Sequence, residues 1–193
     1  MSSGSVEALK TDSLLFRIHP VERGALWFGP APGEPPRHRF DSPDGDYGVC
    51  YLAMEPAGAF VESFLRLDVH RTDTRILAAS ELLNRRIVPV QLTSDLEVVS
   101  LRGPGLAWRG LTASVSSSPV YGDTQRISKA IHAESAELAG ISYRSRHDND
   151  QIAIALFDRA RGALDVLNRR ARSCLDLALA LESDYPFAID FDE

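Results

Sequence analysis

Side chains capable of catalysis are spread along this chain without forming a common catalytic or metal-binding motif. The five histidines have no metal-ligand spacing. The G-x-G-x-x-G and Walker-type nucleotide loops are missing, and so is the G-x-S-x-G turn of many serine hydrolases. His147, Asp148 and Asp150 could in principle hold a cation, but such a charged turn is typical of a solvated loop. We therefore expect no metal, and no motif marks a serine as a nucleophile.

Arginine, tyrosine, glutamate and serine do occur in an ordered series of short segments. These are residues 16–20 (FRIHP), 37–40 (RHRF), 47–53 (YGVCYLA), 59–64 (AFVESF) and, far downstream, 140–146 (GISYRSR). The series resembles the RES family, named for its arginine, glutamate and serine. In that family an arginine- and proline-containing start is followed by Arg-Phe, Y-x-x-x-Y-L-A, A-x-x-E and finally G-I-x-Y-x-S. The resemblance covers about residues 14 to 160.

The resemblance implies an α+β fold like that of ADP-ribosyltransferases, with short mixed sheets and a few flanking helices. It also implies an enzyme that cleaves the nicotinamide–ribose bond of NAD⁺, with phosphate or water as the acceptor. Such proteins are often toxins that a helix-turn-helix (Xre-type) antitoxin blocks. No cofactor is implied beyond NAD⁺ as substrate and phosphate as a candidate co-substrate. Transfer of ADP-ribose to a protein and a non-catalytic binding module of the same fold are the alternatives.

Three residues are candidates for catalysis if the resemblance holds. Nicotinamide leaves NAD⁺ as a neutral molecule, so the main requirement is to stabilise an oxocarbenium-like ribose. Glu62 would supply the carboxylate; alternatively it is a surface glutamate paired with Arg66 four residues on. Arg39 would bind the pyrophosphate through paired charged hydrogen bonds, or it is a mobile loop cation. Tyr51 would stack on nicotinamide and orient it with its hydroxyl, or it simply packs in the core.

Four further residues are candidates for binding NAD⁺ by the same resemblance. Arg17 would share the pyrophosphate with Arg39, although its strand position also fits a solvated face. Tyr47 is an alternative to Tyr51. Ser145 would hydrogen-bond the nicotinamide amide or the ribose, or it caps a turn at the end of a strand. Tyr143 would pack beside Ser145.

The elements that position the N-terminal candidates follow from hydrophobic periodicity. Residues 14–19 and 48–54 alternate as strands do. A helix begins at Pro56, since proline suits a first turn. Its apolar stripe is Ala57, Phe60, Val61, Phe64 and Leu65, and Glu62 lies at the edge of that stripe. The proline- and glycine-rich residues 29–36 form a loop, and residues 41–46 form a turn.

The downstream pattern predicts further alternating elements. Residues 87–92 and 96–101 look like paired strands, with Pro89 at an edge or a bulge. After a polar loop at 114–118, a helix runs from about 124 to 138, capped by Asp123 or Thr124 and stopped by Gly140. Residues 141–145 and 152–157 form strands, whereas 174–181 fits either a helix or a buried strand. This mixture indicates an α+β fold.

Composition limits the classes of protein to which the chain can belong. A length of 193 residues fits one domain, here residues 13–193 after a flexible tail over 1–12. Two cysteines, no signal peptide and no apolar run of about 20 residues indicate a cytoplasmic chain outside the membrane. A net charge of −6 argues against direct nucleic-acid binding but allows a local basic pocket. The acidic C-terminal tail could form a homo-oligomer interface through Tyr185, Phe187 and Phe191.

Overall fold

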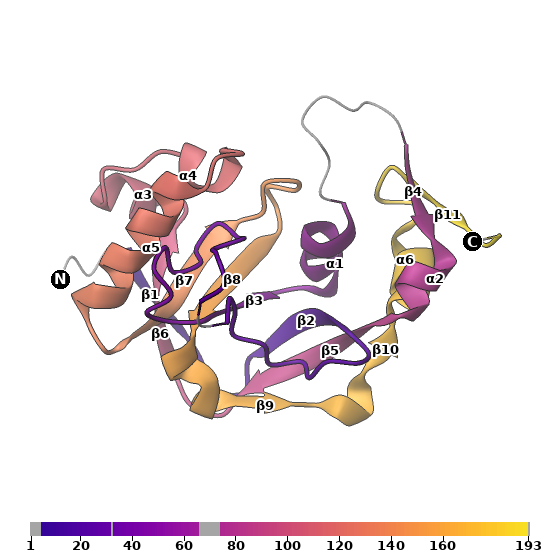
Figure 1. Cartoon of the computed structure of the whole chain (residues 1–193), viewed down its shortest axis with the longest axis horizontal. Coiled ribbons are helices and arrows are strands. Elements are labelled where there is room, and N and C mark those ends of the chain that lie inside the picture. The colour runs from indigo at the N-terminus through magenta and orange to yellow at the C-terminus, as the bar shows by residue number, and fades with distance from the viewer. Residues whose placement is uncertain (1–4, 32, 66–73, 193) are drawn as a thin grey trace.

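A nine-stranded mixed sheet organises the chain (Figure 1). The computed structural model describes residues 5–31, 33–65 and 74–192. Neighbouring strands are antiparallel except β6 and β7, which are parallel. The strand order is β1 (Val6–Leu9), β6 (Leu96–Leu101), β7 (Leu138–Arg144), β8 (Ile152–Phe157), β3 (Val49–Ala53), β2 (Leu14–Pro20), β5 (Arg85–Leu92) and β10 (Arg172–Ser173), with β9 (Leu164–Val166) also paired to β5.

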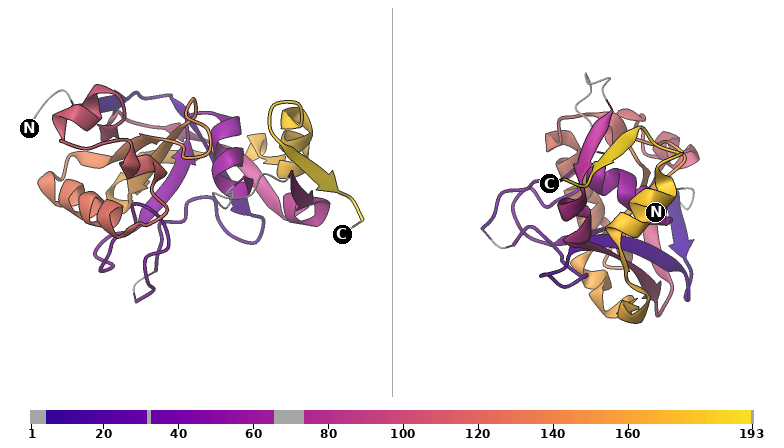
Figure 2. Two further views of the ribbon diagram at one scale, coloured as in Figure 1. Left: turned by 90° about the horizontal axis from the view of Figure 1, so that it is seen from above. Right: turned by 90° about the vertical axis from the view of Figure 1, so that its right-hand side faces the viewer.

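Helices cover different parts of this sheet. Figures 1 and 2 show α3 (Pro104–Trp108), α4 (Ser114–Ser117) and α5 (Gly122–Glu134) at one end of the elongated molecule. At the other end lie α2 (Ala79–Leu83), α6 (Cys174–Leu181) and a parallel pair of strands, β4 (Arg75–Ala78) and β11 (Phe187–Asp190). Helix α1 (Pro56–Phe64) lies between the two groups, and the 3₁₀ turns η2 (Asp158–Ala163) and η3 (Asn168–Arg170) flank β9. No helix in the described ranges is long and apolar enough to cross a membrane.

Helix α1 forms as its sequence pattern predicts. Pro56 occupies its first turn, and the buried side includes Phe60 and Phe64, whose rings lie 5.1 Å apart. Phe60 also contacts Phe187 of β11, at 5.2 Å between ring centroids. This packing buries one face of α1 against α6 and β11, and Glu62 is left partly exposed.

Several expectations about the fold are confirmed. The chain is an α+β protein with a mixed sheet and flanking helices. The strands expected over 14–19 and 48–54 are β2 and β3. Residues 174–181, which fitted either a helix or a buried strand, form the helix α6. Pro89 lies where the edge of the sheet changes partner, because β10 pairs with residues 86–87 and β9 with residues 90–92. A proline lacks the N–H that a strand on that side would need.

Two expectations about strands are wrong. β5 and β6 do not pair with each other, because β6 pairs with β1 and β7 while β5 pairs with β2, β9 and β10. The expected flexible tail over residues 1–12 is not found at Val6–Leu9. These residues form strand β1, with Val6 opposite Val99 and Leu9 opposite Leu96. Hydrogen bonding to an otherwise open sheet edge and burial of Leu9 order this segment.

Two expectations about helices also need correction. α5 begins at Gly122 and ends at Glu134, and no side chain caps its first turn. The apolar residues that continue its pattern enter strand β7 instead, where Leu138 is fully buried. Gly140 lies within that strand rather than ending the helix. The residues read as a polar loop at 114–118 include the short helix α4.

The C-terminal aromatic residues are used mostly inside the chain. Phe187 is buried against α1, and the Tyr185 hydroxyl donates a hydrogen bond of 2.7 Å to Asp148. Phe191 is 65% exposed. Of the three residues expected at an oligomer interface, Phe191 alone presents most of its surface to solvent.

Gly140 should be required by the close approach of β8. A Cβ at this position would lie 2.3 Å from the Ala155 carbonyl oxygen and 2.9 Å from Leu156 Cα. Gly140→Ala should therefore lower the free energy of unfolding in urea by about 2 kcal/mol or more, as overpacking does. Gly162→Ala, where a Cβ meets no atom within 4 Å, is the control and should change it by less than about 0.5 kcal/mol. Equal stability of the two variants would contradict this account of Gly140.

Candidate active site

A cavity of about 1030 Å³ opens beside strands β2 and β3 and the exposed edge of α1. Its volume is at the upper end of the range of small-molecule sites, about 300–1,000 Å³. Loop residues between 20 and 41 form one wall, and Arg146 and His147 approach from the turn between β7 and β8. Arg17, Arg39, Tyr51, Glu62 and Tyr143 all line this cavity. The structure thus brings together candidate residues that are widely separated in sequence.

A short hydrogen bond joins the side chains of Glu62 and Ser145. The Ser145 hydroxyl donates a hydrogen bond of 2.6 Å to Glu62 Oε1 and accepts one of 3.2 Å from the His147 N–H. Ser145 directly follows β7 and is 1% exposed, whereas Glu62 lines the cavity. Ser145 is therefore placed to orient the carboxylate rather than to reach a ligand itself. Arg66, the alternative partner of Glu62, lies outside the described residues.

Arg39 is held in place by main-chain carbonyl groups. Its Nη1 donates to the carbonyl oxygens of Val115 at 3.1 Å and Ser118 at 3.0 Å, both at the α4 segment. Its guanidinium carbon lies 4.9 Å from the centre of the Tyr121 ring. Burial lowers the pKa of Arg39, although a guanidinium stays protonated in proteins. Arg39 is 7% exposed and therefore presents a fixed cation to the cavity rather than a mobile one.

Arg17 contributes a second cation and an unsatisfied donor. Its Nη1 donates to the Tyr51 carbonyl oxygen on the neighbouring strand. Its Nε is buried and has no hydrogen-bond partner among the residues the structure describes. A buried donor without a partner costs about 1–3 kcal/mol, which an anionic ligand in the cavity would offset.

The Tyr51 hydroxyl is already engaged by the protein. It donates 2.9 Å to Asp41 Oδ1 and accepts a bond of 2.9 Å from the Phe40 N–H. Burial, followed by the nearby Asp41 charge, raises the pKa of Tyr51 well above its usual value, so the hydroxyl stays protonated. The expectation that this hydroxyl orients nicotinamide does not fit the geometry. The ring of Tyr51 still lines the cavity.

Asp41 is a buried carboxylate that the sequence pattern placed in a turn and did not mark as a functional residue. It is 1% exposed, and its Oδ2 accepts hydrogen bonds from the N–H groups of Arg37 at 2.8 Å and His38 at 2.7 Å. Together with the bond from Tyr51, these contacts join the turn that carries Arg39 to strand β3. The sequence did contain a signal for this role, because an Asp in a turn often accepts hydrogen bonds from main-chain N–H groups a few residues away.

The two remaining tyrosines differ in their positions. Tyr143 lines the cavity and packs edge-to-face on Phe40 at 4.8 Å. Tyr47 does not line the cavity, so the structure does not place it with the other candidates. Its ring stacks on His132 at 4.0 Å, and its hydroxyl donates to Ser128 at 2.8 Å. Burial raises the pKa of Tyr47 to about 12, as expected for a core tyrosine.

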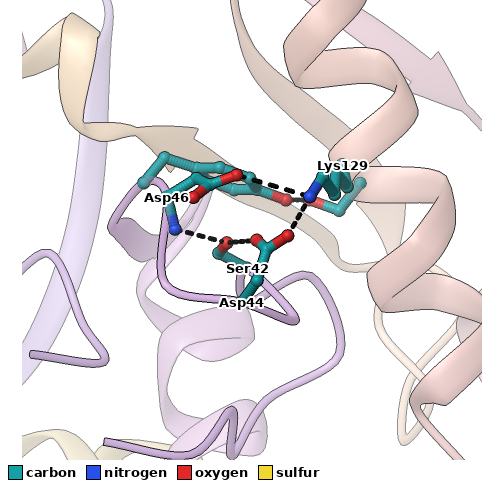
Figure 3. Close-up of polar contacts among 6 residues, drawn as sticks. Ser42, Asp44, Asp46 and Lys129 are labelled. Carbon is teal, nitrogen blue, oxygen red and sulfur yellow. Dashed lines mark hydrogen bonds and ion pairs between the residues drawn. The ribbon is translucent and has the colours of Figure 1, made fainter. Parts of the chain in front are cut away.

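Helix α5 anchors the loop that carries Arg39 and Asp41. Gln125 Nε2 donates to the His38 carbonyl at 3.0 Å, and the Ser128 hydroxyl donates to the Phe40 carbonyl at 2.7 Å. Figure 3 shows Lys129 between Asp44 and Asp46 on the same loop, with Ser42 bonded to Asp44. The long segment between Glu62 and Ser145 therefore contains the helix that holds the Arg39 loop in place.

The charge of the cavity opposes that of the whole chain. The chain has a net charge of −6, yet six arginines and three carboxylates line the cavity. The arginines are Arg17, Arg23, Arg37, Arg39, Arg85 and Arg146. Such a concentration of guanidinium groups favours a ligand with several negative charges, such as a pyrophosphate. No group of three or more His, Cys, Asp and Glu residues within the described part of the chain could hold a metal ion.

Comparison with known proteins agrees with this architecture. The fold is similar to a chain of the crystal structure of the M. tuberculosis MbcT–MbcA toxin–antitoxin complex, with a TM-score of 0.65 and 17% sequence identity over 91% of this chain and 92% of that chain. No curated protein matches the sequence. The RES domain family model matches residues 14–179. The chain therefore belongs to the RES domain family.

Asp41 should be needed for stability because it satisfies three donors in a buried position. Asp41→Ala leaves the N–H groups of Arg37 and His38 and the Tyr51 hydroxyl without this acceptor, so the free energy of unfolding should fall by about 2–4 kcal/mol. Urea denaturation measures this change. Asp46→Asn is the control, because its contact with Lys129 is exposed and should contribute little. An Asp41→Ala variant as stable as this control would rule out the anchoring role.

Proposed function

We propose that this chain consumes NAD⁺ by cleaving the bond between nicotinamide and ribose. The observation that carries the proposal is a carboxylate, Glu62, which Ser145 orients on the wall of an arginine-rich cavity. Membership of the RES domain family supports the same activity. Nothing in the proposal requires a cofactor beyond NAD⁺ as the substrate.

The residues of the cavity match the needs of this reaction. The C1′–N bond of the nicotinamide ribose breaks, and its electron pair remains on nicotinamide, which leaves as a neutral molecule. Positive charge then develops on the ribose, and the Glu62 carboxylate would stabilise it. Because the departing group needs no proton, the hydrogen bond from Ser145 can serve to fix the carboxylate.

The rest of the dinucleotide would use the remaining candidates. Arg17 and Arg39 would bind the pyrophosphate, the first through its unpaired Nε and the second as a fixed cation. The rings of Tyr51 and Tyr143 would contact nicotinamide. Water as acceptor gives ADP-ribose and a proton, whereas phosphate gives ADP-ribose 1″-phosphate. The surplus of arginines would also favour phosphate as a co-substrate.

We further propose that the chain is the toxin of a cytoplasmic toxin–antitoxin pair. The RES domain match and the likeness of fold to a chain of the MbcT–MbcA toxin–antitoxin complex support this role. The partner would be a helix-turn-helix (Xre-type) antitoxin that covers the cavity. Loss of cellular NAD⁺ would be the basis of toxicity.

Product analysis tests the activity and identifies the acceptor. The purified chain is incubated with NAD⁺, with and without phosphate, and the products are examined by mass spectrometry. We expect release of nicotinamide, with ADP-ribose or ADP-ribose 1″-phosphate as the second product. A mass increase on an added protein would instead indicate ADP-ribosyl transfer. Folded protein that releases no nicotinamide under any of these conditions would refute the proposal.

Glu62→Gln should separate catalysis from folding. The amide preserves the shape of the side chain but removes the charge that stabilises the ribose cation, so kcat should fall roughly 100-fold or more. Circular dichroism and urea denaturation should show an intact fold. The control is Glu55→Gln, an exposed carboxylate before α1 that forms no capping hydrogen bond. Expression of the unmodified chain should lower cellular NAD⁺, and expression of Glu62→Gln should not.

A further inference from the structure

Trp27 is an exposed aromatic residue in the wall of the cavity. The chain has two tryptophans, and both are partly exposed, Trp27 by 46% and Trp108 by 62%. Trp27 lines the cavity, whereas Trp108 lies on α3 and does not line it. A large indole surface left open in a polar cavity is a stacking surface for a flat ligand group.

The sheet places Trp27 away from Glu62. Gly29, two residues after Trp27, forms an isolated antiparallel bridge with Val49 at the start of β3. The other end of β3 is Ala53, shortly before α1, which carries Glu62. At about 3.3 Å per residue, β3 spans about 13 Å between these two ends. The carbonyl of Tyr51, which binds Arg17, lies between them.

The indole of Trp27 is held against the main chain. A Cβ on Gly29 would lie 2.4 Å from Trp27 Nε1, so only glycine allows the ring to pack there. The Arg23 guanidinium lies 5.8 Å from the ring centre, close to the outer limit of about 6 Å for a cation–π contact. A base stacked on the indole would therefore displace only a weak contact, and Arg23 would remain nearby to bind phosphate.

We propose that Trp27 forms the adenine subsite of the cavity, with Arg23 beside it. The inference rests on the proposed NAD⁺ activity for the identity of the ligand. Glu62 then faces the nicotinamide ribose at one end of β3, Arg17 faces the pyrophosphate in the middle, and Trp27 stacks on the purine at the other end. A base that stacks on an aromatic side chain needs no sequence of hydrogen-bond donors to be recognised, which fits a loop without a nucleotide motif.

Fluorescence tests the subsite without any turnover. In Trp108→Phe, Trp27 is the single tryptophan, and its emission should be quenched by AMP and by ADP-ribose but not by nicotinamide mononucleotide. In Trp27→Phe, emission from Trp108 should respond to none of these ligands. Quenching of Trp27 by nicotinamide mononucleotide alone, or no response to AMP or ADP-ribose, would overturn the assignment.

Kinetics tests whether the subsite serves the reaction. Trp27→Ala should raise the KM for NAD⁺ roughly tenfold and leave kcat nearly unchanged, and Trp27→Phe should restore most of the affinity. Trp108→Ala is the matched control and should behave as the unmodified chain. An unchanged KM in Trp27→Ala would refute the subsite while NAD⁺ cleavage stands. Quenching by AMP in a chain that does not cleave NAD⁺ would refute the proposed function and support the subsite.

Discussion

The hydrogen bond from Tyr51 to Asp41 joins strand β3, which lines the cavity, to the loop that carries Arg39. Tyr51 belongs to β3, near the middle of the sheet, and Asp41 ends the turn that carries Arg39. Because the carboxylate of Asp41 also accepts two main-chain N–H groups, the turn is fixed at several atoms rather than one. The direction of the Arg39 guanidinium and the exposure of the Tyr51 ring both depend on this buried contact.

The arginine side chains that line the cavity must be held in place by other parts of the chain, because gathering positive charges in one place is unfavourable. Burial removes hydration from the Arg39 guanidinium and lowers its pKa, and repulsion from Arg146 adds a smaller lowering effect. The carbonyl groups of Val115 and Ser118 replace part of that hydration. Helix α5 keeps the loop in place through Gln125, Ser128 and Lys129. An anionic ligand would offset the positive charge that these contacts hold in the cavity.

The sequence predicted a site residue most directly where the local hydrophobic pattern and the chemistry of the side chain pointed to the same position. Glu62 lies at the edge of an apolar helical stripe, and periodicity places it there directly. The partners of β6 could not be predicted, because the choice between β5 and the pair β1 and β7 depends on contacts distant in the chain. Tyr47 and Tyr51 have the same chemistry, and only tertiary packing sends the first to His132 and the second to the cavity. Trp27 lies in a loop without periodicity, so its exposure required the structure.

The geometry of Glu62 and Ser145 favours a serine that orients the carboxylate over a serine that acts as a nucleophile. A serine nucleophile would need its hydroxyl in the cavity and a base behind it. Here the order is reversed, since Ser145 is 1% exposed and the carboxylate it bonds lines the cavity. The group that faces the cavity is therefore a carboxylate oriented by a buried hydroxyl. In the proposed cleavage of NAD⁺, such an arrangement would stabilise the positive charge that develops on the ribose as neutral nicotinamide leaves.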